Sequence, residues 1–329
     1  MRSAKIKAIS YYLPADVLDN KKLNQEFPEW SVDKISSKTG IYERHISDKD
    51  EFVSDMAVTV CEKLFKEHNI KPEEIDFILL CTQSPDYLLP TTACIVQDRL
   101  KIPTSAGALD FNLGCSGYIY GLALAKGLTT GNIASNILLI TSETYSKFIH
   151  PKDKSNRTIF GDGASATLIS VDGYADILDF ELGTDGSGAA NLIVQNSGAR
   201  KHKEKIVDIT DDFGNIRNEN HLYMNGSEIF NFTSRAVPSL IENTLLKHKL
   251  SLTDIDYFVF HQANRFMLEH LRKKIKIDED KFCIALQSCG NTVSSTIPIA
   301  LKDTNVKGTV LLAGFGVGYS WGACILKIN

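Results

Sequence analysis

Residues 70–84 read IKPEEIDFILLCTQS, and residues 250–264 read LSLTDIDYFVFHQAN. Both stretches contain an acidic turn, an Ile-Asp pair, a short apolar run and a polar break. A short apolar run bounded by turn residues is typical of a buried β-strand, here one that ends at the polar break. Because the same features occur twice in the same order, the chain is predicted to contain two copies of one folding unit.

The similarity between the two copies extends into the segments that follow. Each copy continues with a helix-like stretch, at 91–102 in the first copy and at 265–277 in the second. Further segments match in the same order: 107–127 matches 282–303, and 136–143 with 160–171 matches 308–328. Buried strands that alternate with helices predict an α/β protein whose sheets and helices stack in layers.

The repeat also predicts how the chain is divided. We expect an N-terminal half at residues 1–171 and a C-terminal half at residues 172–329. Residues 196–222 are rich in charge and asparagine, so we expect them to form an exposed excursion from the second half.

Length, composition and charge narrow the class of protein. A chain of 329 residues that is 43% hydrophobic can bury a large core, as a globular protein does. Its net charge of −4 gives no general basis for binding nucleic acid. The N-terminus lacks the apolar core of a signal peptide, and no apolar run approaches the roughly 20 residues that cross a bilayer. We therefore expect a cytoplasmic protein with no membrane partner.

Seven cysteines are present, an odd number, and no two have C-x-x-C spacing. A disulfide framework is not expected from such a set, and no Cys/His pairs have the spacing of a zinc site. Most of the cysteines lie in apolar surroundings, such as Cys81 and Cys324, which is typical of small buried hydrophobic residues. Cys115 differs because it lies between Gly114 and Gly117, at the start of a predicted helix.

Three polar residues follow strands at related places in the two copies. Cys115 and Asn291 occupy matching strand-to-helix turns, and His261 ends a strand that matches the one ending at Cys81. In α/β proteins such strand ends build functional sites. A thiol at a helix N-terminus is favoured as thiolate, the nucleophilic form, and an imidazole can do acid–base work.

Each of these residues also has an ordinary structural interpretation when taken alone. Cys115 is compatible with a structural thiol, His261 with a core histidine bonded to backbone, and Asn291 with a helix N-cap. The combination of the three residue types favours a nucleophile with two polar helpers. Cysteine proteases use the same types, but their C-G-[SA]-C-[WY] pattern is missing from this chain.

The arrangement resembles the thiolase superfamily and, within it, β-ketoacyl-acyl carrier protein synthase III. The resemblance covers nearly the whole chain and is strongest in five segments: 110–127, 157–169, 260–264, 289–301 and 313–326. It implies a thiolase fold, in which two duplicated βαβ halves form a five-layer αβαβα sandwich. It also implies a homodimer that uses no metal or redox cofactor.

The resemblance assigns roles to the three polar residues. Cys115 is the nucleophile that becomes acylated, and His261 and Asn291 stabilise the enolate formed when a malonyl thioester on acyl carrier protein loses carbon dioxide. This is a decarboxylative Claisen condensation of the kind that starts fatty-acid synthesis. Backbone N–H groups of the turn at Gly316 and Val317 would hold the oxyanion, and Phe315 would gate decarboxylation. The family usually has glycine at 317, and valine is tolerated there if φ stays negative.

The residues that would bind the thioester carrier depart from the family pattern. Lys34 and Lys38 stand where the family often has a Trp and an Arg that hold coenzyme A, and Trp30 lies one turn earlier. Lys38, Arg157 and Asn264 are the expected contacts for coenzyme A or for the phosphopantetheine of a carrier. The primer can therefore come from either source.

Two further sets of residues concern the acyl chain and the carrier protein. Leu89, before Pro90, would cap the acyl pocket of the partner subunit and leaves the acyl chain length open. Basic residues after the second repeat would dock an acidic carrier, although each is also typical of a solvated helix face: Arg265, Arg272, Lys273 and Lys274.

Alternative functions of the same fold remain at this point. One is an acyltransferase that passes the acyl group to an amine or alcohol in a specialised pathway. Such enzymes often alter the residues that serve the enolate, so retention of His261 and Asn291 favours condensation. A non-catalytic dimer partner would typically lose the nucleophile, whereas Cys115 is present. The sequence identifies neither the acyl donor nor the pathway.

Overall fold

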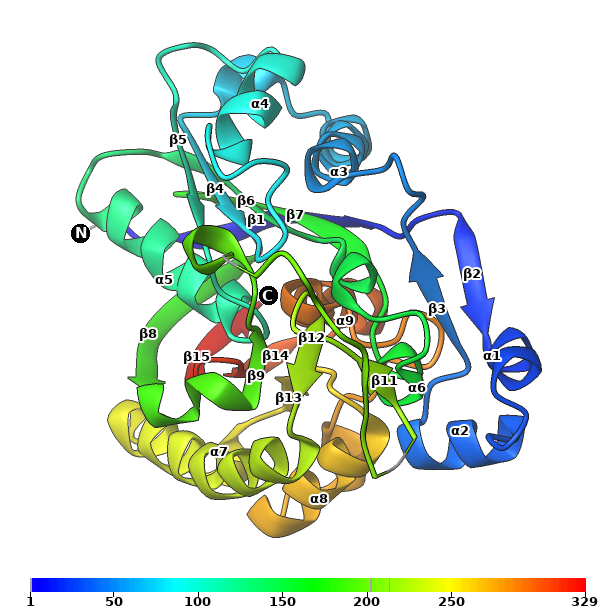
Figure 1. The fold of residues 1–329 in the computed structure, drawn as a ribbon. Coiled ribbons are helices and arrows are strands. Elements are labelled where there is room, and N and C mark those ends of the chain that lie inside the picture. Colours follow the sequence, from blue (N-terminus) through cyan, green and yellow to red (C-terminus); the bar gives the residue numbers. More distant parts are fainter. Residues whose placement is uncertain (1, 202, 213) are drawn as a thin grey trace.

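The computed structural model describes residues 2–201, 203–212 and 214–329. A nine-stranded mixed sheet runs through it in the order β13-β14-β15-β8-β1-β7-β6-β4-β5 (Figure 1). Five strands belong to the first copy of the repeat: β1 (Lys5–Tyr12), β4 (Phe77–Cys81), β5 (Gly107–Phe111), β6 (Asn136–Glu143) and β7 (Gly163–Ser170). Four belong to the second copy: β8 (Ala175–Thr184), β13 (Tyr257–Phe260), β14 (Gly308–Gly316) and β15 (Ser320–Ile328).

The strand order in one copy mirrors that in the other. In the first copy β4 and β6 pair in parallel, and β6, β7 and β1 pair antiparallel. In the second copy β13 and β14 pair in parallel, and β14, β15 and β8 pair antiparallel. The two copies meet edge to edge through only two residue pairs of β1 and β8, Lys5 with Asp176 and Ile6 with Ala175.

Helices form three layers: one outer layer on each copy, and a middle layer that lies between the strands of the two copies. One outer layer contains α3 (Val53–His68) and α4 (Thr92–Arg99), and the other contains α7 (Gly226–His248) and α8 (Arg265–Ile275). The middle layer contains α5 (Gly117–Thr130) and α9 (Thr296–Thr304) (Figure 1). Their apolar side chains pack against strands of both copies. Burial of each large apolar side chain stabilises the fold by roughly 1.5–3 kcal/mol. The result is the expected αβαβα stack of five layers.

One element differs from the repeat. The segment that corresponds to β5 in the second copy forms an isolated bridge, Phe258 with Phe282, and no strand. The side chain of Gln262 takes the place of ladder partners there. Its Oε1 accepts from the N–H of Ala285 (2.8 Å), and its Nε2 donates to the carbonyl of Phe260 (2.7 Å). The backbone beyond Cys283 therefore leaves the strand ladder and is held by the side chain of Gln262.

Two smaller units flank the stack. One comprises β2 (Asp16–Asp19), α1 (Asn20–Glu26), α2 (Val32–Thr39) and β3 (Glu43–Ile46). The other is the predicted excursion, whose residues are mostly exposed where they are described, together with the elements beside it: α6 (Lys154–Arg157), β9 (Leu192–Val194), β10 (Ile209–Thr210), β11 (Ile216–Arg217) and β12 (Leu222–Met224). No helix in the described part of the chain is long and apolar enough to span a bilayer.

Candidate active site

Cys115 lies in the turn between β5 and α5, two residues before the helix begins. The N–H of Gly117 donates to the carbonyl of Gly114 (2.8 Å) and closes the turn. Glycine is required at both positions because atoms of neighbouring side chains lie too close to the backbone for a Cβ atom. A Cβ atom on Gly114 would lie 2.6 Å from Gln83 Oε1, and one on Gly117 would lie 2.3 Å from Cys81 Sγ. The glycines that single out Cys115 in the sequence thus let the loops around it close.

The end of β14 lies directly against this thiol. A Cβ atom on Gly316 would lie 2.8 Å from Cys115 Cβ and 3.0 Å from its Sγ, so no side chain fits there. Val317 keeps a negative φ, and Gly318 takes a φ of +133°, which glycine adopts readily. The turn predicted to hold an oxyanion is therefore beside Cys115, and valine at 317 fits its backbone.

His261 follows the last residue of β13 and is 2% exposed. Its backbone N–H donates to the carbonyl of Ala313 (2.8 Å), and its Nδ1 lies 2.8 Å from Thr296 Oγ1. The ring of Phe315 meets it edge-on, with centroids 5.8 Å apart. Burial lowers the pKa of His261 to about 3, so the imidazole is neutral at physiological pH.

Asn291 is held by backbone bonds to the other copy of the repeat. Its N–H donates to the carbonyl of Ile159 (2.9 Å), and its carbonyl accepts from Gly161 (3.1 Å). Its side-chain Oδ1 accepts from the N–H of Val293 (2.9 Å), which leaves Nδ2 as a donor. Val293 has φ +57°, a strained value for a β-branched residue and one that recurs at functional sites.

The thiol of Cys115 is uncharged in this environment. Burial, followed by the charge of Glu143, raises its pKa to about 12, and its own backbone N–H opposes the rise. The sequence-based expectation of a favoured thiolate is thus wrong for the free site. Desolvation in the closed loops outweighs the helix end.

Glu143, the last residue of β6, is a site residue that the sequence reasoning missed. Its carboxylate is fully buried and accepts from the N–H of Gln83 (3.0 Å) and the hydroxyl of Ser84 (2.8 Å). Burial raises its pKa to about 8. A carboxyl group that ends the apolar run NILLITSE was the available signal, because such strands rarely end in a buried acid.

Asp162 in the FGDG segment is a second buried carboxylate. It accepts from the backbone N–H groups of Ser47 and Ser146 (both 2.8 Å) and from both of their hydroxyls. These bonds fix the loops that follow β3 and β6.

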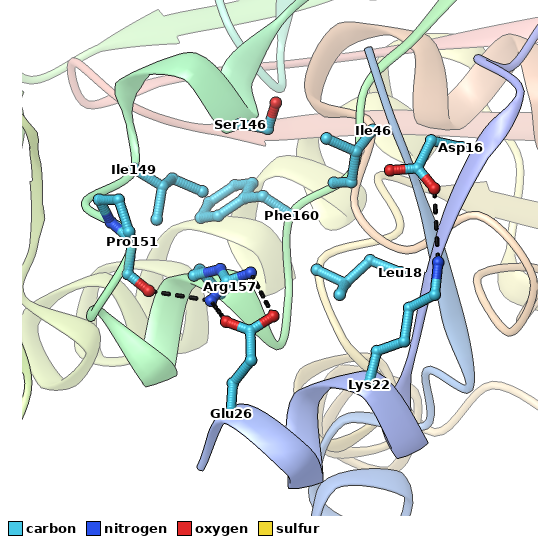
Figure 2. A pocket seen from close by; sticks show the side chains of 10 residues that line it. All are labelled: Asp16, Leu18, Lys22, Glu26, Ile46, Ser146, Ile149, Pro151, Arg157 and Phe160. Carbon is cyan, nitrogen blue, oxygen red and sulfur yellow. Dashed lines mark hydrogen bonds and ion pairs between the residues drawn. The ribbon is translucent and has the colours of Figure 1, made fainter. Parts of the chain in front are cut away.

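Arg157 faces a pocket of about 360 Å³ between α1 and the segment before β7. Figure 2 shows its guanidinium paired with the carboxylate of Glu26 and bonded to the carbonyl of Pro151. Phe160 lines the same pocket and belongs to the apolar cluster around Cys115. Phe160 thus connects the pocket with the cluster around Cys115, and the charge of Arg157 is already matched by Glu26.

The other predicted carrier contacts lie on neighbouring elements. Lys38 on α2 lies 5.9 Å from the ring centre of Trp30, and Lys34 lies 5.1 Å from it. The ammonium groups of both lysines thus lie within cation–π distance of the Trp30 ring. Asn264 caps α8, since its Oδ1 accepts from the N–H of Met267 (2.9 Å).

The four basic residues of α8 do not form one free patch. Arg272 pairs with Glu269 (2.9 Å) and Glu279 (3.3 Å) and is mostly buried. Lys274 donates to Ser234 (2.9 Å), and the side chain of Arg265 packs against Gly40. Lys273 is exposed.

A second pocket, of about 560 Å³, shares lining residues with the apolar cluster that contains Cys115. Tyr145, Leu192 and Val317 line it and also belong to the cluster around Cys115. Leu88 lines the pocket as well, whereas Leu89 is 82% exposed and is not among its lining residues. Within the described ranges, no three His, Cys, Asp or Glu side chains gather as metal ligands.

Neighbouring residues link the three side chains: Gly316 packs against Cys115, the adjacent Phe315 packs against His261, and Val293, which donates to Asn291, belongs to the cluster around Cys115. A buried thiol at a strand-to-helix turn, with a neutral imidazole and an amide from the other copy of the repeat, matches the arrangement expected of a thiolase-type acyl-transfer site. Comparison with known proteins gives the same class. The family described as 3-oxoacyl-(acyl-carrier-protein) synthase III matches residues 109–186, and its C-terminal family matches residues 245–328.

Curated and solved relatives cover the whole chain. Beta-ketoacyl-(acyl-carrier-protein) synthase III of Clostridium perfringens is 36% identical over 100% of both chains. A 2.1 Å crystal structure of a 3-oxoacyl-(acyl-carrier-protein) synthase III is 48% identical, with a TM-score of 0.97 over 99% of this chain and 100% of that one. The enzyme of Burkholderia xenovorans is 33% identical, with a TM-score of 0.88 over 99% of this chain and 94% of that one. The chain belongs to the β-ketoacyl-acyl carrier protein synthase III family of thiolase-fold acyltransferases, which confirms the predicted fold and family.

Proposed function

We propose that this enzyme loads an acyl group on Cys115 and condenses it with malonyl-acyl carrier protein. Cys115 Sγ attacks the thioester carbonyl of the primer, and backbone N–H groups of Cys115 and of the turn at Gly316 and Val317 meet the charge on its oxygen. The carrier thiol leaves with the proton, and the acyl-cysteine remains.

The second half of the reaction needs neutral donors. Loss of carbon dioxide from the malonyl thioester places negative charge on its thioester oxygen. The Asn291 amide and the His261 imidazole would donate to that oxygen. The carbanion then attacks the acyl-cysteine, the C–S bond breaks, and the Cys115 sulfur takes up one proton. The products are a β-ketoacyl thioester, carbon dioxide and free enzyme.

One observation carries this assignment more than any other. The Asn291 Oδ1 is occupied by the Val293 N–H, which leaves its Nδ2 to donate, and burial keeps His261 uncharged. Deprotonation of Cys115 by a charged pair of side chains would not require two neutral hydrogen-bond donors. Two neutral donors suit an enolate.

The family relationship supports several further parts of the proposal. The enzyme would work in the cytoplasm, start fatty-acid synthesis or a related pathway, and form a homodimer in which Leu89 caps the partner's acyl pocket. The halves would divide at residue 171. Acyl carrier protein would dock near α8, with Arg265, Lys273 and Lys274 as the cationic contacts. Lys38, Arg157 and Asn264 would guide the phosphopantetheine arm.

The test is to follow acyl mass on the enzyme and on the carrier. Wild-type protein, Cys115→Ala and the control Cys94→Ala, an exposed cysteine, are mixed with acyl thioesters and malonyl-acyl carrier protein. We expect acylation in wild type and in the control, at least about 10⁴-fold less in Cys115→Ala, and transfer to the carrier with loss of carbon dioxide. Acylation without any transfer to the carrier would favour another acceptor, such as an amine or alcohol.

A further inference from the structure

The pocket of about 560 Å³ beside Cys115 is not lined by apolar groups alone. Three polar side chains cross its wall, and each follows a different parallel strand: Gln83 after β4, Asn112 after β5 and Tyr145 after β6. The Tyr145 hydroxyl donates to Gln83 Oε1 (3.2 Å), and Gln83 Nε2 donates to Asn112 Oδ1 (3.1 Å). We call this Tyr145–Gln83–Asn112 series the polar line.

The polar line runs next to the nucleophile and is held in place. Gln83 Oε1 would lie 2.6 Å from a Cβ atom on Gly114, the residue before Cys115. The backbone N–H of Gln83 is fixed by the buried carboxylate of Glu143. Tyr145 is only 4% exposed and packs in the cluster that contains Cys115. An acyl group on Cys115 that enters this pocket therefore passes the polar line.

Counting donors shows what the line can still bind. Gln83 uses one of its two amide N–H groups, and Asn112 uses only its oxygen. In the described part of the chain no other group accepts from these remaining N–H groups. The pocket wall thus carries three N–H donors that no group of the described chain engages. A saturated alkyl chain would cover them without replacing their hydrogen bonds to water, which is unfavourable.

The charges around the pocket decide which acceptor suits these donors. Asp86 lines the pocket, and the buried Glu143 lies behind Gln83. The carboxylate of Asp86 disfavours an anionic acyl group, such as a dicarboxylic acid half-ester. An uncharged oxygen, in a hydroxyl or a keto group, meets no such repulsion.

We infer that the acyl group carried by Cys115 bears an uncharged oxygen near its thioester end, which the amides of Gln83 and Asn112 recognise. This inference rests on the proposed function, because it describes the primer of that reaction. It names Gln83 and Asn112 as the specificity-determining residues.

The experiment compares loading rates of three pantetheine thioesters on Cys115, followed by intact mass: butanoyl, 3-hydroxybutanoyl and 3-oxobutanoyl. We expect at least one oxygenated chain to load about tenfold faster than butanoyl, the effect of one average hydrogen bond. Gln83→Leu and Asn112→Leu should reduce that ratio to about two or less. Gln25→Leu, the same change at an exposed position on α1, should leave it unchanged. Asn112 is exposed, so its variant is not expected to impair folding.

The outcomes separate this inference from the function on which it rests. Equal loading of butanoyl and both oxygenated chains would overturn the inference and leave the condensing function intact. A preference that survives in both leucine variants would also overturn it. If none of the thioesters modified Cys115, the proposed function itself would fail, and the inference with it.

Discussion

The two halves of the candidate site differ in their ionisable groups, although they come from equivalent turns of one repeat. The half that presents Cys115 contains a buried acid, Glu143, and raises the pKa of the thiol. The half that presents His261 and Asn291 is neutral, with an imidazole whose pKa is lowered to about 3. The comparison teaches that duplication supplied the scaffold, and local burial then assigned the nucleophile to one copy and the neutral donors to the other.

The largest expected effect comes from introducing charge into the neutral half. Asn291→Asp keeps the acceptor for the Val293 N–H and replaces the donor with a carboxylate. We expect condensation from a preloaded acyl-enzyme to fall by about 10²–10³-fold, because the enolate loses a donor and meets a like charge. Acylation should change much less. Single-turnover assays separate the two steps, and Asn132→Asp, an exposed site, is the control.

A smaller effect is expected from the group that orients the imidazole. Thr296 Oγ1 lies 2.8 Å from His261 Nδ1 and 3.1 Å from the carbonyl of Val293. When the hydroxyl donates to Nδ1 instead of to that carbonyl, the ring proton is on Nε2, which can then donate to the enolate. Thr296→Val should lower kcat for condensation about tenfold with little change in KM. Thr296→Ser should restore most of the activity. Equal loss in both variants would contradict a role for the hydroxyl.

Replacing the buried acid of the half that presents Cys115 should moderately increase the reactivity of that thiol. Glu143→Gln removes the charge that raises the pKa of Cys115, so alkylation of Cys115 by iodoacetamide at pH 9 should accelerate roughly threefold to tenfold. Glu62→Gln, exposed on α3, should not change the rate.

The same variant tests the sign of the pH dependence. The pKa of Glu143 is raised to about 8 from an unfolded value of about 4.3. The folded state binds the proton more tightly, so its stabilising contribution is complete at low pH and is lost as pH rises through 8. Wild-type Tm should therefore fall relative to that of Glu143→Gln between pH 5 and pH 8.

The smallest effect concerns the approach past Arg157. Glu26→Gln removes the carboxylate that matches the arginine charge, which frees Arg157 to meet a phosphate. KM for a coenzyme A thioester should fall about twofold to threefold. KM for the matching pantetheine thioester, which lacks the phosphates, should not change. A parallel fall for both substrates would contradict phosphate recognition at Arg157.

Much of this architecture is readable from the repeat. The apolar runs that predict strands are β4 and β13, and the flanking glycines correctly mark Cys115 as unlike the other cysteines. The absence of a strand at 282–286 was not predictable, because it depends on which backbone groups the side chain of Gln262 bonds. Glu143 and Thr296 were missed because burial and pairing, and not residue type, make them part of the site. The ion pair of Arg157 with Glu26 depends on a contact between segments far apart in the chain.

The bonds of Gln262 have a consequence for how the chain tolerates insertions and deletions. Most strands absorb a change of length in the loop at their exposed end. The segment from Cys283 to Asn291 has no such slack, since Gln262 holds its start and the backbone of Ile159 and Gly161 holds its end. Insertion or deletion of one residue in this segment would displace the Asn291 amide rather than a loop at the protein surface. The number of residues between Gln262 and Asn291 is thus constrained, because Gln262 in the second half holds the start of the segment and backbone groups of the first half hold its end.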